Sequence, residues 1–268
     1  MTIPWYQPVA DEVHLFRAAW AARLPVLLRG PTGCGKTRFV EHMAATLPRH
    51  DGGGGVPLVT VSCHEDLTAN DLVGRHLLMH DRTEWNDGPL TRAVRQGAIC
   101  YLDEIVEARR DTTVVVHSLS DHRRMLPIEK TGELLHAHPD FLLVISYNPG
   151  YQTVLKDLKP STRQRFVGID FDYPAPEVEA AIVAHESGLD ATLSATLATI
   201  ARRLRDMGEA DGRGDGVSTR ALIHAAQLIG RGIAPRRACA VALAAVLGDD
   251  PDGRAAAVDV IDVSLPQT

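Results

Sequence analysis

The segment Gly30–Thr37 constrains the fold of this chain more than any other stretch. Its sequence, GPTGCGKT, fits the pattern G-x-x-x-x-G-K-[ST], whose glycines let backbone N–H groups surround a polyphosphate. Lys36 adds a charge for the β- and γ-phosphates, and Thr37 offers a hydroxyl ligand to Mg2+. An apolar run precedes the loop and apolar residues recur at helical spacing after it, so the helix terminus would face the phosphates. The predicted nucleotide contacts are Gly30, Pro31, Thr32, Gly33, Cys34, Gly35, Lys36, Thr37 and Arg38.

Composition narrows the class of protein. The chain has 268 residues, 45% hydrophobic and 23% charged, which is typical of a globular protein with one large domain or two modest ones. The formal net charge of -6 does not favour nucleic acid as a specific partner. No apolar run is long enough to span a bilayer, and the first residues do not resemble a signal peptide. The four cysteines form no C-x-x-C pair, so we expect free thiols and a cytoplasmic location.

A second motif is the apolar run Ile99–Leu102, which is followed directly by Asp103 and Glu104. An apolar strand that ends in two acids predicts an Asp that holds Mg2+ and a Glu that polarises the attacking water. Carboxylates at a buried strand end are costly unless a cation is present. The alternative is that Asp103 caps a short helix over 104–108. The phosphate loop upstream favours the metal-binding interpretation.

Four more side chains are candidates for catalysis. Asn148 follows an apolar run and could orient the same water, although its Asn-Pro-Gly sequence is also good turn chemistry. Arg163 and Arg165 precede the last predicted strand, and either could reach a neighbouring subunit's phosphate. Arg220 starts a predicted helix and could contact the γ-phosphate. For each arginine the alternative is a solvated surface residue. The catalytic candidates are Glu104, Lys36, Asn148, Arg165, Arg163 and Arg220.

Hydrophobic periodicity divides the chain into an α/β nucleotide-binding domain over 1–173 and a smaller helical lid over 174–268. The first domain is expected to contain a parallel central sheet flanked by helices, with hairpin inserts near 75–85 and 123–138. The predicted strands of the sheet are 25–28, 57–63, 98–102, 141–147 and 168–171. Other predicted helices are 111–121, 177–186, 193–207, 218–231 and 235–247, and no element is assigned to 252–268.

These motifs together resemble the MoxR branch of the AAA+ ATPases, and within it the CbbQ/NirQ/NorQ group. The similarity extends from Tyr6 to about Leu247. The matching stretches are LPVLLRGPTGCGKTRFV, CHEDLTANDLVGR, DGPLTRAV, GAICYLDEIVEAR, DTTVV, ISYNPGYQ, KPSTRQRF and GVSTR.

The resemblance implies an ATPase that hydrolyses ATP to ADP and phosphate with Mg2+ as the metal. The implied roles are Walker A for Lys36 and Thr37, Walker B for Asp103 and Glu104, sensor 1 for Asn148, sensor 2 for Arg220, and arginine finger for Arg165 or, second, Arg163. It also implies a homo-hexameric ring, because an arginine acting in trans needs a heterologous interface. An adaptor protein with a von Willebrand A domain would recruit a metalloenzyme client.

The client expected from the resemblance is inhibited Rubisco. The stretches 137–141, 156–159 and 171–177 resemble CbbQ members, whereas 74–78 and 161–166 resemble NorQ members. We therefore favour a CbbQ-type Rubisco activase ATPase subunit, with maturation of nitric oxide reductase, as in NorQ and NirQ, as the alternative. A nucleotide-gated assembly scaffold similar to the gas-vesicle protein GvpN is a third interpretation.

Overall fold

The computed structural model describes residues 3–79, 82–149, 158–210, 216–247 and 250–265. The chain forms two compact units. The N-terminal unit comprises Met1–Gly30 and Lys36–Asp170, and the C-terminal unit comprises Pro31–Gly35 and Phe171–Thr268. The predicted domain boundary at 173/174 remains a proposal.

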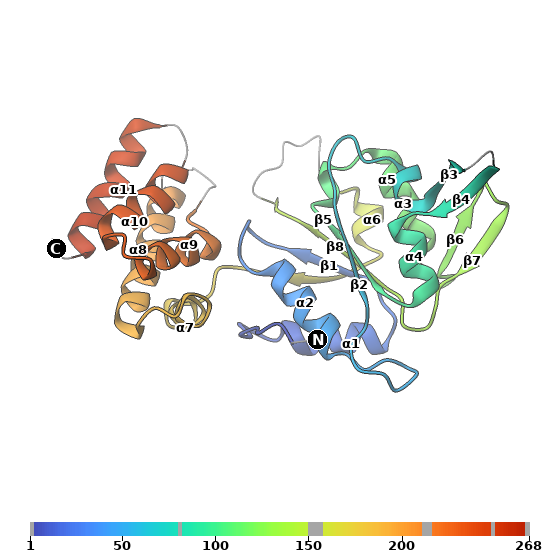
Figure 1. Cartoon of the computed structure of the whole chain (residues 1–268), viewed down its shortest axis with the longest axis horizontal. Coiled ribbons are helices and arrows are strands. Elements are labelled where there is room, and N and C mark those ends of the chain that lie inside the picture. The colour runs from blue at the N-terminus through green and yellow to red at the C-terminus, as the bar shows by residue number, and fades with distance from the viewer. Residues whose placement is uncertain (1–2, 80–81, 150–157, 211–215, 248–249, 266–268) are drawn as a thin grey trace. The chain divides into compact units, whose positions relative to one another are not determined.

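A five-stranded sheet forms the centre of the N-terminal unit, in the order β2-β5-β8-β1-β9 (Figure 1). Its strands are β1 (Val26–Arg29), β2 (Leu58–Ser62), β5 (Ile99–Asp103), β8 (Leu142–Tyr147) and β9 (Val167–Asp170). All four pairings are parallel, as predicted. Every residue of β8 and the first four of β5 are buried, which explains why neither strand shows polar alternation.

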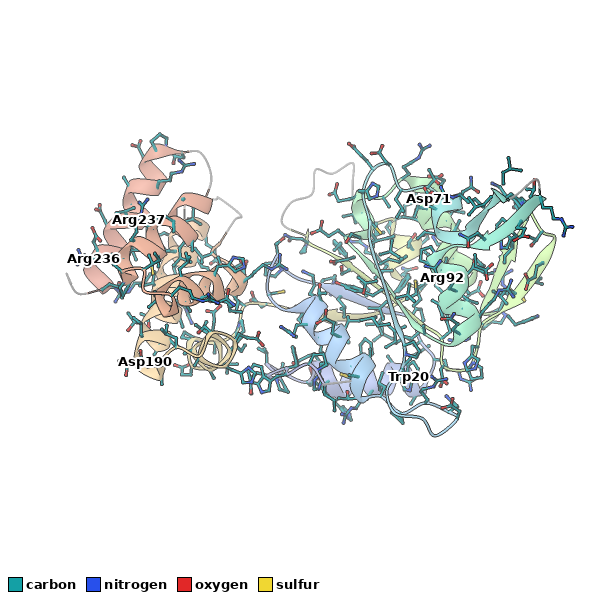
Figure 2. All side chains as sticks on the ribbon, in the orientation of Figure 1. Trp20, Asp71, Arg92, Asp190, Arg236 and Arg237 are labelled. Atoms are coloured by element: carbon teal, nitrogen blue, oxygen red, sulfur yellow. The ribbon has the colours of Figure 1, made fainter. Side chains whose placement is uncertain are left out.

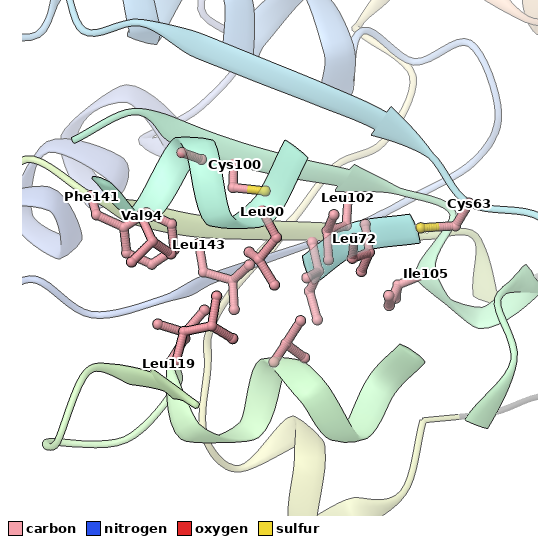
Figure 3. Close-up of a cluster of buried hydrophobic side chains, with 14 of the residues drawn as sticks. Cys63, Leu72, Leu90, Val94, Cys100, Leu102, Ile105, Leu119, Phe141 and Leu143 are labelled. Atoms are coloured by element: carbon pink, nitrogen blue, oxygen red, sulfur yellow. The ribbon is translucent and has the colours of Figure 1, made fainter. Parts of the chain in front are cut away.

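Helices cover both faces of the sheet (Figure 1). Their bounds are α1 (Glu12–Ala21), α2 (Lys36–Thr46), α3 (Ala69–Val73), α4 (Pro89–Gln96), α5 (Arg110–Val115) and α6 (Pro160–Arg163), with 3-10 turns η1 (Ile105–Glu107) and η2 (Val116–Ser118). On the α3–α5 face, Leu90 of α4 packs with Leu102 and Leu143 in one buried apolar cluster (Figure 3). On the other face, the rings of Phe16 in α1 and Phe39 in α2 meet edge to face, with centroids 5.3 Å apart.

Two antiparallel hairpins extend from this unit (Figure 1), where inserts were predicted. They are β3 (Gly74–Met79) with β4 (Arg82–Asp87), and β6 (Met125–Ile128) with β7 (Glu133–His136). Arg95 of α4 donates to Asp87 of the first hairpin at 2.8 Å and to both carboxylate oxygens of Glu133 in the second. One arginine therefore fixes both hairpins to the same helix.

The C-terminal unit is helical. Its helices are α7 (Pro176–Ser187), α8 (Ala191–Ala210), α9 (Thr219–Gly230), α10 (Pro235–Ala242) and α11 (Pro251–Ser264), with a 3-10 turn η4 (Ala244–Val246). Arg236 of α10 is labelled in Figure 2. It donates to the carbonyl oxygens of Asp262 and Leu265, which joins α10 to the end of α11. No helix in the described ranges is long and apolar enough to cross a membrane.

The structure differs from the sequence predictions for several elements. The helix predicted over 111–121 ends as the short turn η2, where the Ser120 hydroxyl donates to the carbonyl of His117 and competes with helical bonding. The helix predicted over 235–247 breaks at Leu243, whose backbone is distorted and whose side chain is fully buried. Two helices were missed, α6 and α11. The middle of the loop predicted over 208–216 lies outside the described residues, and α8 extends to Ala210.

Candidate nucleotide-binding site

The phosphate loop follows strand β1, which lies between β8 and β9, and leads into α2 at Lys36. Gly33 and Gly35 have φ angles of 71° and 104°, in the left-handed region where an L side chain is strained. The backbone therefore favours glycine at both positions, and Gly35 is the second glycine of the pattern. The loop connects a parallel strand to a helix N-terminus, the usual geometry for binding a phosphate.

Lys36 lies along this loop. Its side chain is 9% exposed, and its Nζ donates to the carbonyl oxygen of Gly30 at 2.8 Å. This contact holds the ammonium at the loop, where it can attract a polyphosphate. Arg38, the other predicted cation of this segment, is exposed instead. Its Nη1 lies 3.9 Å from Glu41 Oε2 on the surface of α2.

The two acids lie at the carboxyl end of β5. The carboxylate of Asp103 accepts hydrogen bonds from the hydroxyls of Tyr101, at 2.7 Å, and of Ser146. Glu104 is exposed and has φ 56° and ψ 48°. This left-handed conformation costs about 1–2 kcal/mol for a residue with a Cβ. The N–H of Glu104 donates to Ser146 Oγ at 3.2 Å, which helps to hold that conformation.

The donor set fits Mg2+. The Asp103 carboxylate and the Thr37 hydroxyl are oxygen ligands, and Tyr101 hydrogen-bonds to both side chains. Mg2+ commonly takes one or two protein oxygens and completes its shell with water and phosphate. In the described ranges, no group of three or more His, Cys, Asp or Glu side chains could hold a metal ion.

Asn148 and the two candidate finger arginines also belong to the N-terminal unit. Asn148 follows β8, which lies between β5 and β1 in the sheet, so it is placed at the same edge as Asp103 and the phosphate loop. Arg163 ends α6. Arg165 is 37% exposed, donates to the carbonyl of His117 at 3.4 Å and lies 3.8 Å from a carboxylate oxygen of Asp121.

Arg220 is exposed and is the second residue of α9, in the C-terminal unit. That unit includes the loop segment Pro31–Gly35. Within it, Tyr173 Oη donates to the carbonyl oxygen of Thr32 at 3.1 Å. A Cβ added at Gly33 would lie 2.6 Å from Ser218 Cβ and 3.5 Å from Arg220 Cβ. The start of α9 therefore packs against the tip of the phosphate loop.

The cysteines do not add reactive groups to the site. Cys34 in the loop is buried, and none of the four cysteines is in a disulfide. Burial, followed by the charges of Asp103 and Glu104, raises the pKa of the Cys63 thiol to about 12. Burial raises the pKa of Cys100 to about 12 as well. Both remain thiols at physiological pH.

Sequence reasoning missed Tyr101 and Ser146. Both side chains are fully buried, in strands β5 and β8, and both bind Asp103. The available signal was a hydroxyl two residues before a candidate site residue in each strand, Tyr101 before Asp103 and Ser146 before Asn148. A buried hydroxyl needs a partner, so each one pointed to a polar group nearby.

Two family models cover most of the chain. Residues 25–166 match the AAA domain of the dynein-related subfamily, and residues 179–264 match the CbbQ/NirQ/NorQ C-terminal domain. The chain belongs to the CbbQ/NirQ/NorQ family of AAA+ ATPases. The predicted resemblance is confirmed, and with it a nucleotide-binding ATPase.

Named relatives in this family are closely similar over nearly the whole chain. CbbQ of Hydrogenophilus thermoluteolus is 59% identical, covering 94% of this chain and 91% of the relative. NorQ of Paracoccus denitrificans is 57% identical, covering 93% and 89%. The denitrification regulatory protein NirQ of Pseudomonas aeruginosa is 56% identical, covering 98% of each. Identities so close to one another do not distinguish a CbbQ from a NorQ or NirQ member.

Solved structures support the fold alone. NtrX of Brucella abortus, solved with ADP, is similar with a TM-score of 0.56 at 14% identity, covering 86% of this chain and 52% of that one. A candidate ATPase from Cytophaga hutchinsonii is similar with a TM-score of 0.51 at 16% identity, covering 93% and 80%. Both agree with the predicted AAA+ architecture.

Proposed function

We propose that this family member is a Mg2+-dependent ring ATPase that uses ATP hydrolysis to remodel a metalloenzyme client, with inhibited Rubisco as the favoured client. The observation that carries the ATPase part is the arrangement of the acids. Asp103 is hydrogen-bonded by two buried hydroxyls, and Glu104 is held in a left-handed conformation directly after it. Backbone strain of this kind is typical of residues with a functional role.

Each side chain then has a role in hydrolysis. Lys36 binds the β- and γ-phosphates, and Asp103 and Thr37 would hold Mg2+, which neutralises charge on the phosphates when bound. Glu104 orients the attacking water for in-line displacement, with Asn148 placed to assist it. The transferred phosphoryl group needs little covalent chemistry, so the contribution of these residues is positioning and electrostatic stabilisation.

The active ring is proposed to be a homo-hexamer. Arg165, or Arg163, would act on the phosphate bound by a neighbouring subunit, and Arg220 would sense the γ-phosphate within its own subunit. Support comes from the exposure of Arg165, whose side chain is 37% exposed and is therefore accessible to a neighbouring subunit. A contact supplied in trans defines a heterologous interface, and a heterologous interface closes into a ring when the rotation allows it.

The client is proposed from the relatives. CbbQ shares 59% of its aligned residues with this chain, which supports reactivation of Rubisco together with an adaptor that carries a von Willebrand A domain. The alternative is NorQ- or NirQ-type maturation of nitric oxide reductase, supported by relatives at 57% and 56% identity. The protein is proposed to act in the cytoplasm.

An affinity capture tests the client. Tagged Glu104→Gln is purified with ATP and Mg2+ from extracts of its own cells, and the bound proteins are identified. Lys36→Ala, which should not retain ATP, is the matched control. Rubisco subunits with a von Willebrand A protein, enriched only by Glu104→Gln, would support the favoured client. Nitric oxide reductase subunits would support the alternative, and equal capture by both variants would contradict a nucleotide-dependent client.

A second candidate is a nucleotide-gated assembly scaffold, similar to GvpN, in which ATP binding alone holds the partner. The feature that allows it is the separation of phosphate binding by Lys36 from water orientation by Glu104. Glu104→Gln would still activate the client if the protein is a scaffold. It would fail to activate the client if hydrolysis drives remodelling.

A further inference from the structure

Tyr101 occupies an unusual place for a polar side chain. It is fully buried in β5, between β2 and β8 of the parallel sheet, in the run Ile99–Leu102 whose other side chains are apolar. Its phenol oxygen contacts three polar side chains of the predicted site and its surroundings. It donates to Asp103 Oδ1 at 2.7 Å and lies 3.1 Å from Ser146 Oγ, and the Thr37 side chain hydrogen-bonds to it as well.

Counting the protons gives these bonds a direction. The single phenol proton of Tyr101 is directed at the Asp103 carboxylate, which has no proton to offer in return. The Thr37 hydroxyl must therefore donate its own proton to the phenol oxygen. That leaves the lone pairs of Thr37 Oγ1 available to a cation, as coordination by a hydroxyl requires.

We propose that Tyr101 is a positioning residue for the metal, which aligns the two predicted Mg2+ ligands from one buried phenol. It orients the hydroxyl of Thr37 through the bond that it accepts and the carboxylate of Asp103 through the bond that it donates. This inference rests on the proposed Mg2+-dependent function, since both ligands belong to that site.

The surroundings hold the phenol against Asp103, because Tyr101 is fully buried in β5 and its oxygen lies 2.7 Å from Asp103 Oδ1. Ser146 supports the same arrangement from β8. Its hydroxyl donates to Asp103 and accepts the N–H of Glu104, so β8 helps to hold both acids. Hydrogen-bond partners of metal ligands usually set the orientation and affinity of the site.

The test compares ADP affinity with and without Mg2+ for the full-length wild type and Tyr101→Phe, by calorimetry with EDTA or graded Mg2+. Tyr101→Phe keeps the ring and removes only the phenol oxygen. We expect its half-saturating Mg2+ concentration to rise about tenfold. ADP affinity in EDTA should stay within about twofold of wild type, because the phenol makes no contact that serves the nucleotide alone. A variant damaged only in its packing would lose affinity in both conditions.

Trp85→Phe is the matched control, because it removes an aromatic donor to a carboxylate, that of Asp87 at 2.6 Å, on the β3–β4 hairpin. Its Mg2+ dependence should equal that of wild type. Ser146→Ala gives the same measurement if Tyr101→Phe does not fold, with Ser120→Ala as its control. We expect Ser146→Ala to raise the half-saturating Mg2+ concentration for ADP binding, and Ser120→Ala to leave it unchanged.

The outcomes separate the two proposals. If ADP binding to the wild type does not respond to Mg2+, the proposed Mg2+ site is wrong and this inference is wrong with it. If the wild type responds and Tyr101→Phe matches it, the Mg2+ site stands and the positioning role of Tyr101 is refuted.

Discussion

The buried ion pair of the C-terminal unit offers a sharp test of what holds that unit together. Glu179 has no exposed surface, and Arg205 is 8% exposed. Arg205 donates to the two carboxylate oxygens of Glu179 at 2.9 and 2.7 Å and to the carbonyl of Val217 at 2.7 Å. Thr219 adds a hydroxyl donor, and the guanidinium lies 3.9 Å from the centre of the Tyr173 ring. Removing one partner would leave the other charge buried and unpaired.

The expected magnitudes follow from these contacts. Glu179→Ala should lower the free energy of unfolding by about 3–5 kcal/mol, because it strands the Arg205 charge. Thr219→Val removes one hydrogen bond to a charged group and should cost about 1.5–3 kcal/mol. The double variant Glu179→Met with Arg205→Met should be more stable than either single methionine variant, since it removes both charges together.

Urea unfolding of the full chain, followed by circular dichroism, measures these differences from the transition of the helical unit. Arg202→Met is the control, because its pair with Asp206 has N and O 3.8 Å apart and both side chains are more than half exposed. Its cost should stay below about 0.5 kcal/mol. If Glu179→Ala lowers the free energy of unfolding by less than about 1 kcal/mol, the reasoning is refuted. It is also refuted if the double methionine variant is no more stable than the less stable of the two single methionine variants.

Other perturbations test the site. Glu104→Gln should bind ATP with near wild-type affinity and lose about 100-fold or more in turnover, and near-normal phosphate release would remove Glu104 from its role. Turnover per chain should rise with protein concentration as rings form. Mixing Glu104→Gln with Arg165→Ala should restore activity that neither variant has alone, because some subunit interfaces then combine an intact Glu104 with an intact Arg165. A mixture as inactive as its components would contradict the trans role of Arg165. Cys63 and Cys100, with pKa raised to about 12 by burial, carry little thiolate until the pH approaches that value. They should resist iodoacetamide at pH 8.5 in the native protein and react after unfolding, as mass spectrometry of the alkylated peptides would show.

The sheet was predictable because its strands carry strong local signals. β8 was predicted over 141–147 and observed as Leu142–Tyr147, since six consecutive buried positions leave no polar alternation. The phosphate loop was predictable for a related reason: only glycine suits the backbone at Gly33 and Gly35. In these places the residue type and the local backbone demand coincide.

Helix ends in the C-terminal unit were less predictable. The helix predicted over 235–247 is divided at Leu243, whose burial among neighbouring helices overrides its local propensity. The last helix, α11, was missed, since the sequence analysis assigned no element to 252–268. Its real signals were the capping Asp250, which accepts two backbone N–H bonds, and a proline at the first helical position.

The supporting residues of the site could not be derived from spacing, because they depend on how distant strands align. Ser146 lies 43 residues after Asp103, and only the parallel pairing of β5 with β8 brings the two together. Placing hydroxyls in these strands has an energetic cost, since a buried hydroxyl without a hydrogen-bond partner lowers the free energy of unfolding by about 1–3 kcal/mol. Tyr101 and Ser146 avoid that cost by bonding to Asp103 and to the N–H of Glu104. A phenylalanine and an alanine would fill the same sheet without any such requirement. The hydroxyls are therefore better explained by the orientation of the two acids than by the stability of the sheet.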